Sequence, residues 1–448
     1  MKSFYLLSLG CAKNTVDSDS IGTLLLQQGY QSTANPQEAD LLIVNTCGFI
    51  APARTESIES LQELSQLKNE NQMLIAAGCM TQLYADEVIA NVPKIDGVLG
   101  SRHWMDIVEL IQQIGKNKNR NLPPFHLPDE HQDHPVEDHV HRTSLNGKSA
   151  YLKIAEGCRR NCAFCSIPSI KGTLVSRSPQ SILADASYLQ AQGVKELILI
   201  AQDTSDYGVD KADGYTFTYL IKDILEQTPN IPWIRMLYAF PGCINDDFIQ
   251  LMANNARFLP YLDIPLQHAH PSILKSMHRP FNIDETRQQL KELRKVVPNL
   301  VLRTTFIVGY PGEGEAEFQT LLDFVEEMQF DRVGVFPFYY EAGTPSAPLG
   351  DPISEEVKQE RIDRLMTLQQ KISLQKNQAW VGKTMTILIE GQDRDQNISI
   401  GRSFRDAPEI DGLVFIEGLF EIGDMVTARI TDALPYDLMA RPVKSKRK

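Results

Sequence analysis

The sequence of 448 residues has no long hydrophobic run and few cysteines. No stretch approaches the 18 or more consecutive apolar residues of a membrane span, and the apolar stretch before Cys11 is too short for the core of an export signal. Seven cysteines are too few for a disulfide scaffold in a chain of this length, and their odd number favours metal chemistry in a reducing compartment. We therefore expect a cytoplasmic protein with no membrane segment.

Positive charge is also scarce. The chain has 44 Lys and Arg against 57 Asp and Glu, a formal net charge of −13, which argues against broad adsorption to nucleic acid and suits a basic partner. No GxGxxG or P-loop pattern follows the first predicted strand, so the usual phosphate cradle for a dinucleotide or ATP is not expected.

Three cysteines do stand close together, Cys158, Cys162 and Cys165, in a CxxxCxxC pattern after an apolar run. Three thiolates can hold three corners of an iron-sulfur cube, which leaves one iron open for a small molecule. The neighbouring Arg159 and Arg160 should lower the pKa of these thiols. Two alternatives stay open: a structural zinc site, which usually needs four closed ligands, and three inert buried thiols.

Residues 1–115 alternate apolar runs with helical patterns, which predicts an α/β domain with a parallel, doubly wound sheet. Three of its predicted strands run directly into Cys11, Cys47 and Cys79. Since parallel strands share one carboxyl edge, these thiols can converge into a second three-cysteine cluster, helped by the positive ends of the following helices. The alternative is three small buried core residues.

Residues 116–148 are rich in Pro, charge and His, and we expect a linker or long surface loop. Irregular spacing in such a segment is more typical of solvated coil than of a metal site. Its histidines are His126, His131, His134, His139 and His141.

Residues 149–375 contain six strand-like runs separated by helical patterns, which predicts a partial or complete α/β barrel with its chemistry at the carboxyl ends of the strands. Polar clusters follow several of these runs and are candidates for the active site. For Gln202 and Asp203 the alternative is that they cap a helix. Cys243 has no partner in sequence and is expected to be structural. The polar clusters are Gln202-Asp203-Thr204, Pro265-Leu266-Gln267-His268, and Arg303 with Gly309-Tyr310-Pro311-Gly312-Glu313.

Residues 380–443 contain three alternating segments with glycines between them, which predicts a small antiparallel β-barrel. Between Val381 and Val443, six Lys and Arg stand against eleven Asp and Glu. A groove for single-stranded nucleic acid should be positive, so a basic protein is the better partner.

Taken together, these residues resemble a known family. CxxxCxxC on an α/β barrel, with Phe164 before the last cysteine, resembles the radical S-adenosylmethionine (SAM) enzymes. Cys11, Cys47 and Cys79 on an amino-terminal domain, with a carboxyl-terminal barrel similar to the TRAM type, narrow the resemblance to the methylthiotransferases. The motifs that resemble the ribosomal-protein branch are Ser8-Leu9-Gly10-Cys11-Ala12-Lys13-Asn14, Asn45-Thr46-Cys47-Gly48-Phe49-Ile50, Ala201-Gln202-Asp203-Thr204, Leu262-Asp263-Ile264-Pro265-Leu266-Gln267-His268 and Asp406-Ala407-Pro408-Glu409-Ile410-Asp411-Gly412.

The resemblance implies a transferase that adds a methylthio group to the β-carbon of an aspartate in the small-subunit ribosomal protein numbered twelve, free or in the small subunit. It implies two 4Fe-4S clusters: one on Cys158, Cys162 and Cys165, which binds SAM, and an auxiliary one on Cys11, Cys47 and Cys79. It further implies a low-potential electron donor such as flavodoxin, and we expect a monomer. The residues expected to contact SAM are Phe164, Gln202, Thr204 and Arg303.

One departure affects the SAM contacts. The Gly-Gly-Glu stretch of many radical SAM enzymes is absent, and Ala201-Gln202-Asp203 stands in its place. Two other functions remain alternatives: methylthiolation of a tRNA adenosine by the other branch of the family, which the acidic final domain disfavours, and a non-catalytic, metal-stabilised RNA-binding scaffold.

Overall fold

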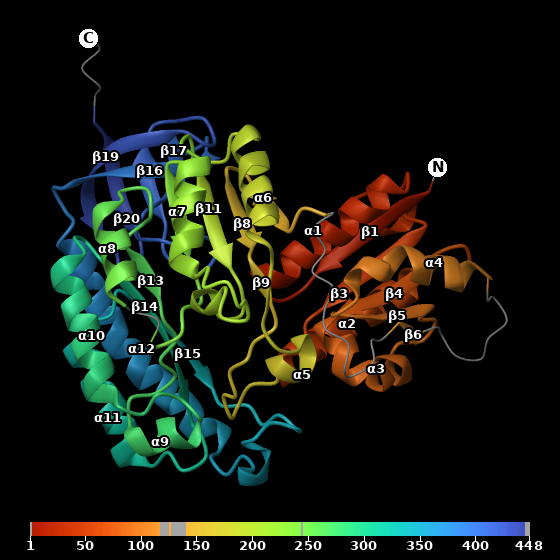
Figure 1. The fold of residues 1–448 in the computed structure, drawn as a ribbon, viewed down its shortest axis with the longest axis horizontal. Helices are drawn as coiled ribbons and strands as arrows, with labels where there is room; N and C mark the ends of the chain where they lie inside the picture. The colour runs from red at the N-terminus through yellow and green to blue at the C-terminus, as the bar shows by residue number, and fades with distance from the viewer. Residues whose placement is uncertain (1, 117–124, 127–139, 243–244, 444–448) are drawn as a thin grey trace.

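The computed structural model describes residues 2–116, 125–126, 140–242 and 245–443. Three parts are visible in Figure 1: an amino-terminal α/β domain in red and orange, a central open barrel in yellow to cyan, and a small β-barrel in blue. Cys243 and three of the linker histidines, His131, His134 and His139, lie outside the described residues. Among the helices of the described part, none is both long and apolar enough to cross a membrane.

The amino-terminal sheet is parallel throughout, with strand order β2-β1-β3-β4-β5-β6. The order changes direction between β1 and β3, and ligands of open α/β sheets bind at such a switch point. Its strands are β1 (Ser3–Ser8), β2 (Gln31–Ser32), β3 (Leu41–Thr46), β4 (Met73–Gly78), β5 (Gly97–Gly100) and β6 (Phe125–His126).

Helices cover both faces of this sheet, as predicted. Along β3, Leu41 and Ile43 pack with α1 and α4, whereas Leu42 and Val44 pack with α2 and α3. This alternation follows from the two-residue period of a strand, and burial on both faces explains why the strand is continuously apolar. The helices are α1 (Ala12–Gln27), α2 (Ala51–Leu67), α3 (Cys79–Asn91) and α4 (Ile107–Lys116).

Two strands fall in the range 116–148, for which we predicted a linker. β6 adds to the edge of the amino-terminal sheet, and β7 (Thr143–Asn146) forms an antiparallel hairpin with the first central strand. Neither strand shows a periodic apolar pattern, because each is short and depends on hydrogen bonds to its neighbour. His141 lies between them and contacts Asp185 through Nδ1 at 2.5 Å.

The central domain has six parallel strands, all of which the sequence predicted. Together with the antiparallel β7, they form two sheets, β12-β11-β8-β7 and β13-β14-β15. A parallel bridge between Ile234 and Phe258 joins the two sheets. Within the described residues β8 and β15 do not pair, so the barrel is partial. The strands are β8 (Ser149–Lys153), β11 (Glu196–Ile200), β12 (Trp233–Met236), β13 (Tyr261–Asp263), β14 (Val301–Val308) and β15 (Arg332–Pro337).

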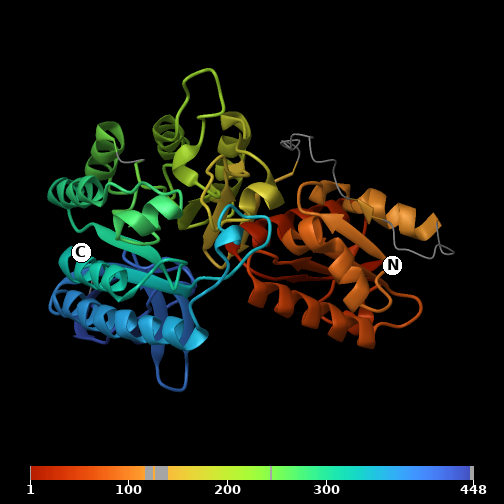
Figure 2. The same ribbon diagram turned by 90° about the horizontal axis from the view of Figure 1, so that it is seen from below.

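Helices cover the outer face of this barrel (Figure 2), and their apolar sides form the largest core cluster. Two short strands, β9 (Ala155–Glu156) and β10 (Val175–Ser176), pair beside the first strand. The helices are α5 (Ile167–Lys171), α6 (Pro179–Ala191), α7 (Phe217–Gln227), α8 (Asp246–Asn254), α9 (Pro271–Ser276), α10 (Ile283–Val296), α11 (Glu315–Met328) and α12 (Glu355–Gln378).

The carboxyl-terminal domain is a closed barrel in the order β16-β17-β18-β20-β19. The prediction of a small barrel is confirmed, although β17 and β20 were not predicted and β18 pairs with β20 in parallel. It contacts the amino ends of the central strands, where Arg402 of β17 pairs with Glu196 at 2.6 Å. Its strands are β16 (Thr384–Asp393), β17 (Ile398–Ser403), β18 (Val414–Glu417), β19 (Met425–Ala433) and β20 (Leu438–Pro442).

Candidate functional site: two cysteine triads

Cys11, Cys47 and Cys79 lie at the carboxyl ends of β1, β3 and β4, next to the switch point of the sheet. We call these three residues the amino-terminal triad. Cys11 is the N-cap of α1 and Cys79 is the first residue of α3. The parallel register therefore brings together three cysteines that are far apart in sequence, as predicted.

Glycines beside the cysteines allow this close approach. A Cβ on Gly10 would lie 2.9 Å from Sγ of Cys47, and a Cβ on Gly48 would lie 2.5 Å from Cα of Met80, the neighbour of Cys79. Contacts this short are not tolerated by a side chain, so the loops need glycine at both positions.

The three thiols of the amino-terminal triad differ in acidity. Desolvation raises the pKa of Cys79 to about 12 and also raises that of Cys47. For Cys11 desolvation acts in the same direction, but Lys13 and the backbone N–H groups of Asn14 and Lys13 lower its pKa overall. Of the three thiols, only Cys11 has its pKa lowered overall, because desolvation outweighs the favourable contacts of Cys47 and Cys79.

Cys158, Cys162 and Cys165, here called the central triad, occupy the loop between β9 and α5 at the open end of the barrel. The loop is held by backbone bonds: the N–H of Cys158 donates to the carbonyl of Gly172 at 3.0 Å, and that of Ala163 donates to Met277 at 2.9 Å. Gly157 has φ of +65°, and a Cβ there would lie 1.9 Å from the carbonyl oxygen of Thr173. These backbone contacts and the glycine at position 157 hold the loop in its conformation.

The prediction that Arg159 and Arg160 lower the thiol pKa values holds only in part: the charge and the backbone N–H of Arg160 do lower the pKa of Cys158, but desolvation outweighs them. Both guanidiniums are paired with carboxylates: Arg159 with Asp206 at 2.5 Å, and Arg160 with Asp203 at 2.9 Å. Their charge is largely neutralised, so desolvation raises the pKa of Cys158 to about 11.

Desolvation likewise raises the pKa of Cys165 to about 12. In the metal-free chain these thiols therefore hold their protons. Metal binding must release them, since the thiolate is the ligand.

Lys13 lies between the two triads. It is 8% exposed, its Nζ lies 3.3 Å from the ring centroid of Tyr238, and its charge interacts with Cys11 and Cys79 of one triad and with Cys165 of the other. Lys13 belongs to a motif quoted above, but its place beside both triads was not predicted. The charge of Lys13 is therefore coupled to cysteines of both triads.

A line of polar residues continues from Tyr238 along the barrel interior. Asp263 Oδ2 accepts the backbone N–H of Tyr238 at 3.1 Å, and Oδ1 accepts Nη1 of Arg303 at 2.7 Å. Nε of Arg303 lies 3.7 Å from Asp411, which belongs to the loop 406–412 of the carboxyl-terminal domain. Arg303, which was expected to contact SAM, is thus already paired with a carboxylate of the chain itself.

The other residues predicted to contact SAM differ in how far they are buried and in whether their polar groups are already hydrogen-bonded. Thr204 is fully buried, and its hydroxyl accepts the backbone N–H of Ala201 at 2.9 Å. Phe164 is partly buried against the small apolar cluster that contains Met277 and Tyr310. Gln202 is partly exposed, and its side chain forms no hydrogen bond within the described part of the chain.

His268, which belongs to one of the polar clusters singled out in the sequence, is a core residue. It is fully buried, its Nδ1 accepts the backbone N–H of His270 at 2.9 Å, and Nε2 faces Glu313 at 3.2 Å. Glu313 also accepts Nη1 of Arg361 from α12 at 2.7 Å. This buried network fixes the turn after β14, and its role is structural.

Each triad offers three thiols as possible metal ligands. Among the described residues, no group of three Cys, His, Asp or Glu side chains lies close enough together to hold a metal ion. A structural zinc site usually closes four ligands on one ion, whereas three thiolates can hold three corners of an iron-sulfur cube.

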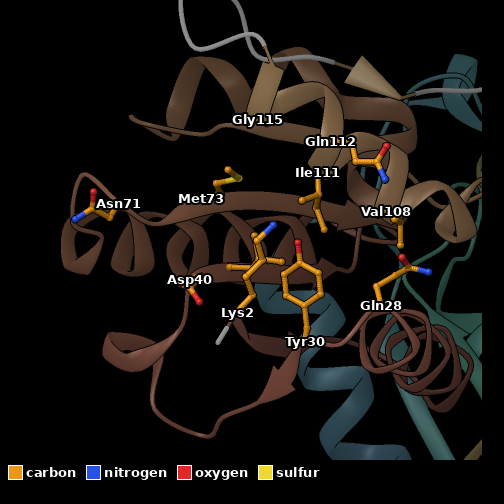
Figure 3. A pocket seen from close by; sticks show the side chains of 11 residues that line it. Lys2, Gln28, Tyr30, Asp40, Asn71, Met73, Val108, Ile111, Gln112 and Gly115 are labelled. Atoms are coloured by element: carbon orange, nitrogen blue, oxygen red, sulfur yellow. The ribbon is translucent and has the colours of Figure 1, made fainter.

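A separate cavity of about 570 Å³ lies in the amino-terminal domain. Its lining residues Lys2, Tyr30, Asp40 and Met73 precede or begin strands β1, β2, β3 and β4 (Figure 3). It therefore lies at the amino end of the sheet, opposite the cysteines, and ligands of such sheets bind at the carboxyl end. We therefore do not place the active site in this cavity.

Three family models match the chain: the uncharacterized protein family UPF0004 over residues 3–100, the Radical SAM superfamily over 152–325, and the TRAM domain over 381–443. The structure is also similar to TsrM, a radical SAM methyltransferase from Kitasatospora setae (TM-score 0.56, 16% identity, 78% of this chain and 77% of that chain). This similarity concerns the fold alone.

Relatives named "Ribosomal protein uS12 methylthiotransferase RimO" match almost the whole chain. The one from Chloroflexus aurantiacus is 44% identical and covers 97% of this chain and 98% of its own length. The one from Desulforamulus reducens is 43% identical and covers 98% and 99%. With its three matching domains and two cysteine triads, the chain belongs to the RimO family of radical SAM methylthiotransferases.

Proposed function

We propose that the protein adds a methylthio group to the β-carbon of an aspartate in ribosomal protein uS12, using two 4Fe-4S clusters and SAM. The observation that carries the proposal is the buried Lys13, whose charge interacts with cysteines of both the central and the amino-terminal triad. A tRNA substrate finds no support among the relatives described above. The acidic composition of residues 381–443 also favours a basic protein.

The central triad would hold the SAM-binding cluster, which supplies one electron to cleave SAM and so provides the radical that can attack an unactivated C–H bond. The amino-terminal triad would hold the auxiliary cluster and supply the sulfur. The chain's own residues orient these groups: the backbone of Gly172 and Met277 fixes the central loop, and Asp203 and Asp206 hold Arg159 and Arg160 beside it.

Gln202 follows β11, is partly exposed and forms no side-chain hydrogen bond within the described residues, and we assign it to SAM. Phe164 packs on the apolar cluster that contains Met277 and Tyr310, and would border the cofactor on its apolar side. Thr204 and Arg303 would act indirectly, because Thr204 fixes the turn after β11 and Arg303 orients Asp263.

The cellular setting follows from the chemistry. Oxygen-sensitive clusters and a ribosomal substrate favour the cytoplasm, and a low-potential donor such as flavodoxin would supply the electron. We propose that the enzyme acts as a monomer on the free ribosomal protein or on the small subunit.

The test is reconstitution of the full chain, counting of iron and sulfide, and mass spectrometry of uS12 after incubation with SAM and a reductant. We expect about eight irons per chain and one methylthio group on an aspartate. Modification of tRNA instead, or absence of 5′-deoxyadenosine, would contradict the proposal. The second result would favour the non-catalytic scaffold.

A further inference from the structure

Arg279 lies against the central triad, yet no motif indicated it. Its Nη1 is 3.6 Å from Sγ of Cys162, and its charge also acts on Cys165. The residue is 7% exposed. It follows α9 in the chain and lies 117 residues after Cys162, the cysteine that it contacts.

The surroundings hold the guanidinium in one orientation. It stacks over the ring of Phe240 at 4.1 Å, and Arg160 stacks on the same ring at 4.0 Å. Nη2 donates to the carbonyl of Pro265, whereas Nε has no hydrogen-bond partner among the described residues. These contacts leave Nη1 directed at Cys162.

Arg279 differs from its neighbours in how its charge is balanced. Arg159 and Arg160 form ion pairs with Asp206 and Asp203. No ion pair of Arg279 with a carboxylate occurs in the ranges that the structure describes. A buried cation without a carboxylate partner, aimed at a cysteine sulfur, indicates that another negative group belongs beside it.

We propose that Arg279 is a positioning residue that raises the reduction potential of the cluster on Cys158, Cys162 and Cys165, by donating an N–H to the Cys162 sulfur and placing beside it a positive charge that no ion pair of the described residues offsets. The inference rests on the proposed function, because it requires that this triad holds a cluster. Reduction adds one electron from the external donor and breaks no bond. The added negative charge is stabilised by a nearby cation and by hydrogen bonds to the sulfurs.

The test is an EPR-monitored redox titration, with dithionite as reductant, of the reconstituted full chain. The signal to follow is the one that changes when SAM is added, which identifies the cluster of the central triad. Arg279→Gln keeps an N–H donor but loses the charge, and we expect a lower midpoint potential at unchanged iron content. Arg279→Lys keeps the charge, and its midpoint should lie closer to that of the wild type.

Arg364→Gln is the matched control. Arg364 also stacks on a ring, that of Phe318 at 4.9 Å, but it lies on α12 and pairs with Glu315. Its substitution should leave the midpoint unchanged. As a second readout, 5′-deoxyadenosine formation by Arg279→Gln should fall with a weak reductant and recover with a stronger one, which a merely structural defect would not do.

Several outcomes would overturn the inference. An unchanged or raised midpoint in Arg279→Gln would do so while leaving the proposed function intact. Loss of iron in both the Gln and Lys variants would show that Arg279 serves assembly rather than potential. Absence of any SAM-responsive signal in the wild type would overturn the proposed function as well.

Discussion

Asp17 of α1 accepts a hydrogen bond from Nζ of Lys171 of α5 at 2.8 Å. Asp17 follows Cys11 by six residues and Lys171 follows Cys165 by six, so this buried pair connects the segments that follow one cysteine of each triad. Arg142 and Lys153 also donate to Asp17, at 2.5 and 2.7 Å. The relative position of the two triads is therefore fixed by buried charges.

Lys171→Met should uncouple the cleavage of SAM from the transfer of the methylthio group. Asp17 keeps two cations, so we expect the chain to fold and bind iron, but the triads lose one constraint on their separation. A misplacement of about 1 Å can lower a rate by roughly 10²-fold. Measured by mass spectrometry, the ratio of methylthiolated product to 5′-deoxyadenosine should fall at least about tenfold. Lys222→Met, which removes an exposed lysine over Tyr219, is the control and should keep the ratio.

Single cysteine substitutions should separate the two clusters. Cys158→Ala should abolish 5′-deoxyadenosine formation, whereas Cys47→Ala should retain it and lose methylthio transfer. Each should lose about four irons, because a cluster needs its thiolate set. Cys243→Ala, outside both triads, should keep the full iron content. Production of 5′-deoxyadenosine by Cys158→Ala would refute the assignment of the central triad.

Gly48→Ala should affect the amino-terminal triad alone. Its Cβ would lie 2.5 Å from backbone Cα of Met80, and moving that backbone displaces Cys79. We expect loss of about half of the iron, with SAM cleavage retained. Gly115→Ala is a suitable comparison, because a Cβ at that position meets nothing within 4 Å. Full iron content in Gly48→Ala would contradict the close approach of these loops.

Glu196 should contribute to stability in a pH-dependent way. Desolvation opposes ionisation, but Arg402 and Arg235 lower the pKa of this buried carboxyl to about 2. Since its unfolded pKa is about 4.3, its contribution is complete above that pH and is lost as the pH falls toward about 2. Glu196→Gln should reduce the free energy of unfolding at neutral pH by roughly 3 kcal/mol, and the difference from wild type should shrink in acid.

Chemical denaturation across this pH range measures the effect. Glu417→Gln provides the comparison, since Glu417 pairs with Arg441 while both side chains are more than half exposed. Exposed pairs contribute about 0 to 1 kcal/mol. Equal destabilisation by both variants would argue against the assigned role of Glu196.

The sequence predicted the architecture because strand and helix periods are local. All six central strands and the convergence of Cys11, Cys47 and Cys79 follow from apolar runs and from the shared edge of a parallel sheet. Strands such as β6 and β17 were missed because their residues lack a clear two-residue alternation.

The electrostatics of the site could not be predicted in this way. Arg159 and Arg160 stand next to a cysteine in the sequence, which suggested that they lower its pKa, but Asp203 and Asp206 come from another loop. Arg279 and Lys13 likewise act on cysteines that only the tertiary fold brings near. Pairings between residues far apart in sequence leave no periodic signal.

The buried charges around Asp17 also bear on whether the domains are interchangeable. Without the amino-terminal domain, Arg142, Lys153 and Lys171 would face one another with Glu156 as their shared carboxylate. Mutual repulsion of three desolvated cations would destabilise the barrel that remains. Chimeras that exchange the amino-terminal domain must therefore carry an acid at position 17, and the chain should unfold as a cooperative whole rather than domain by domain.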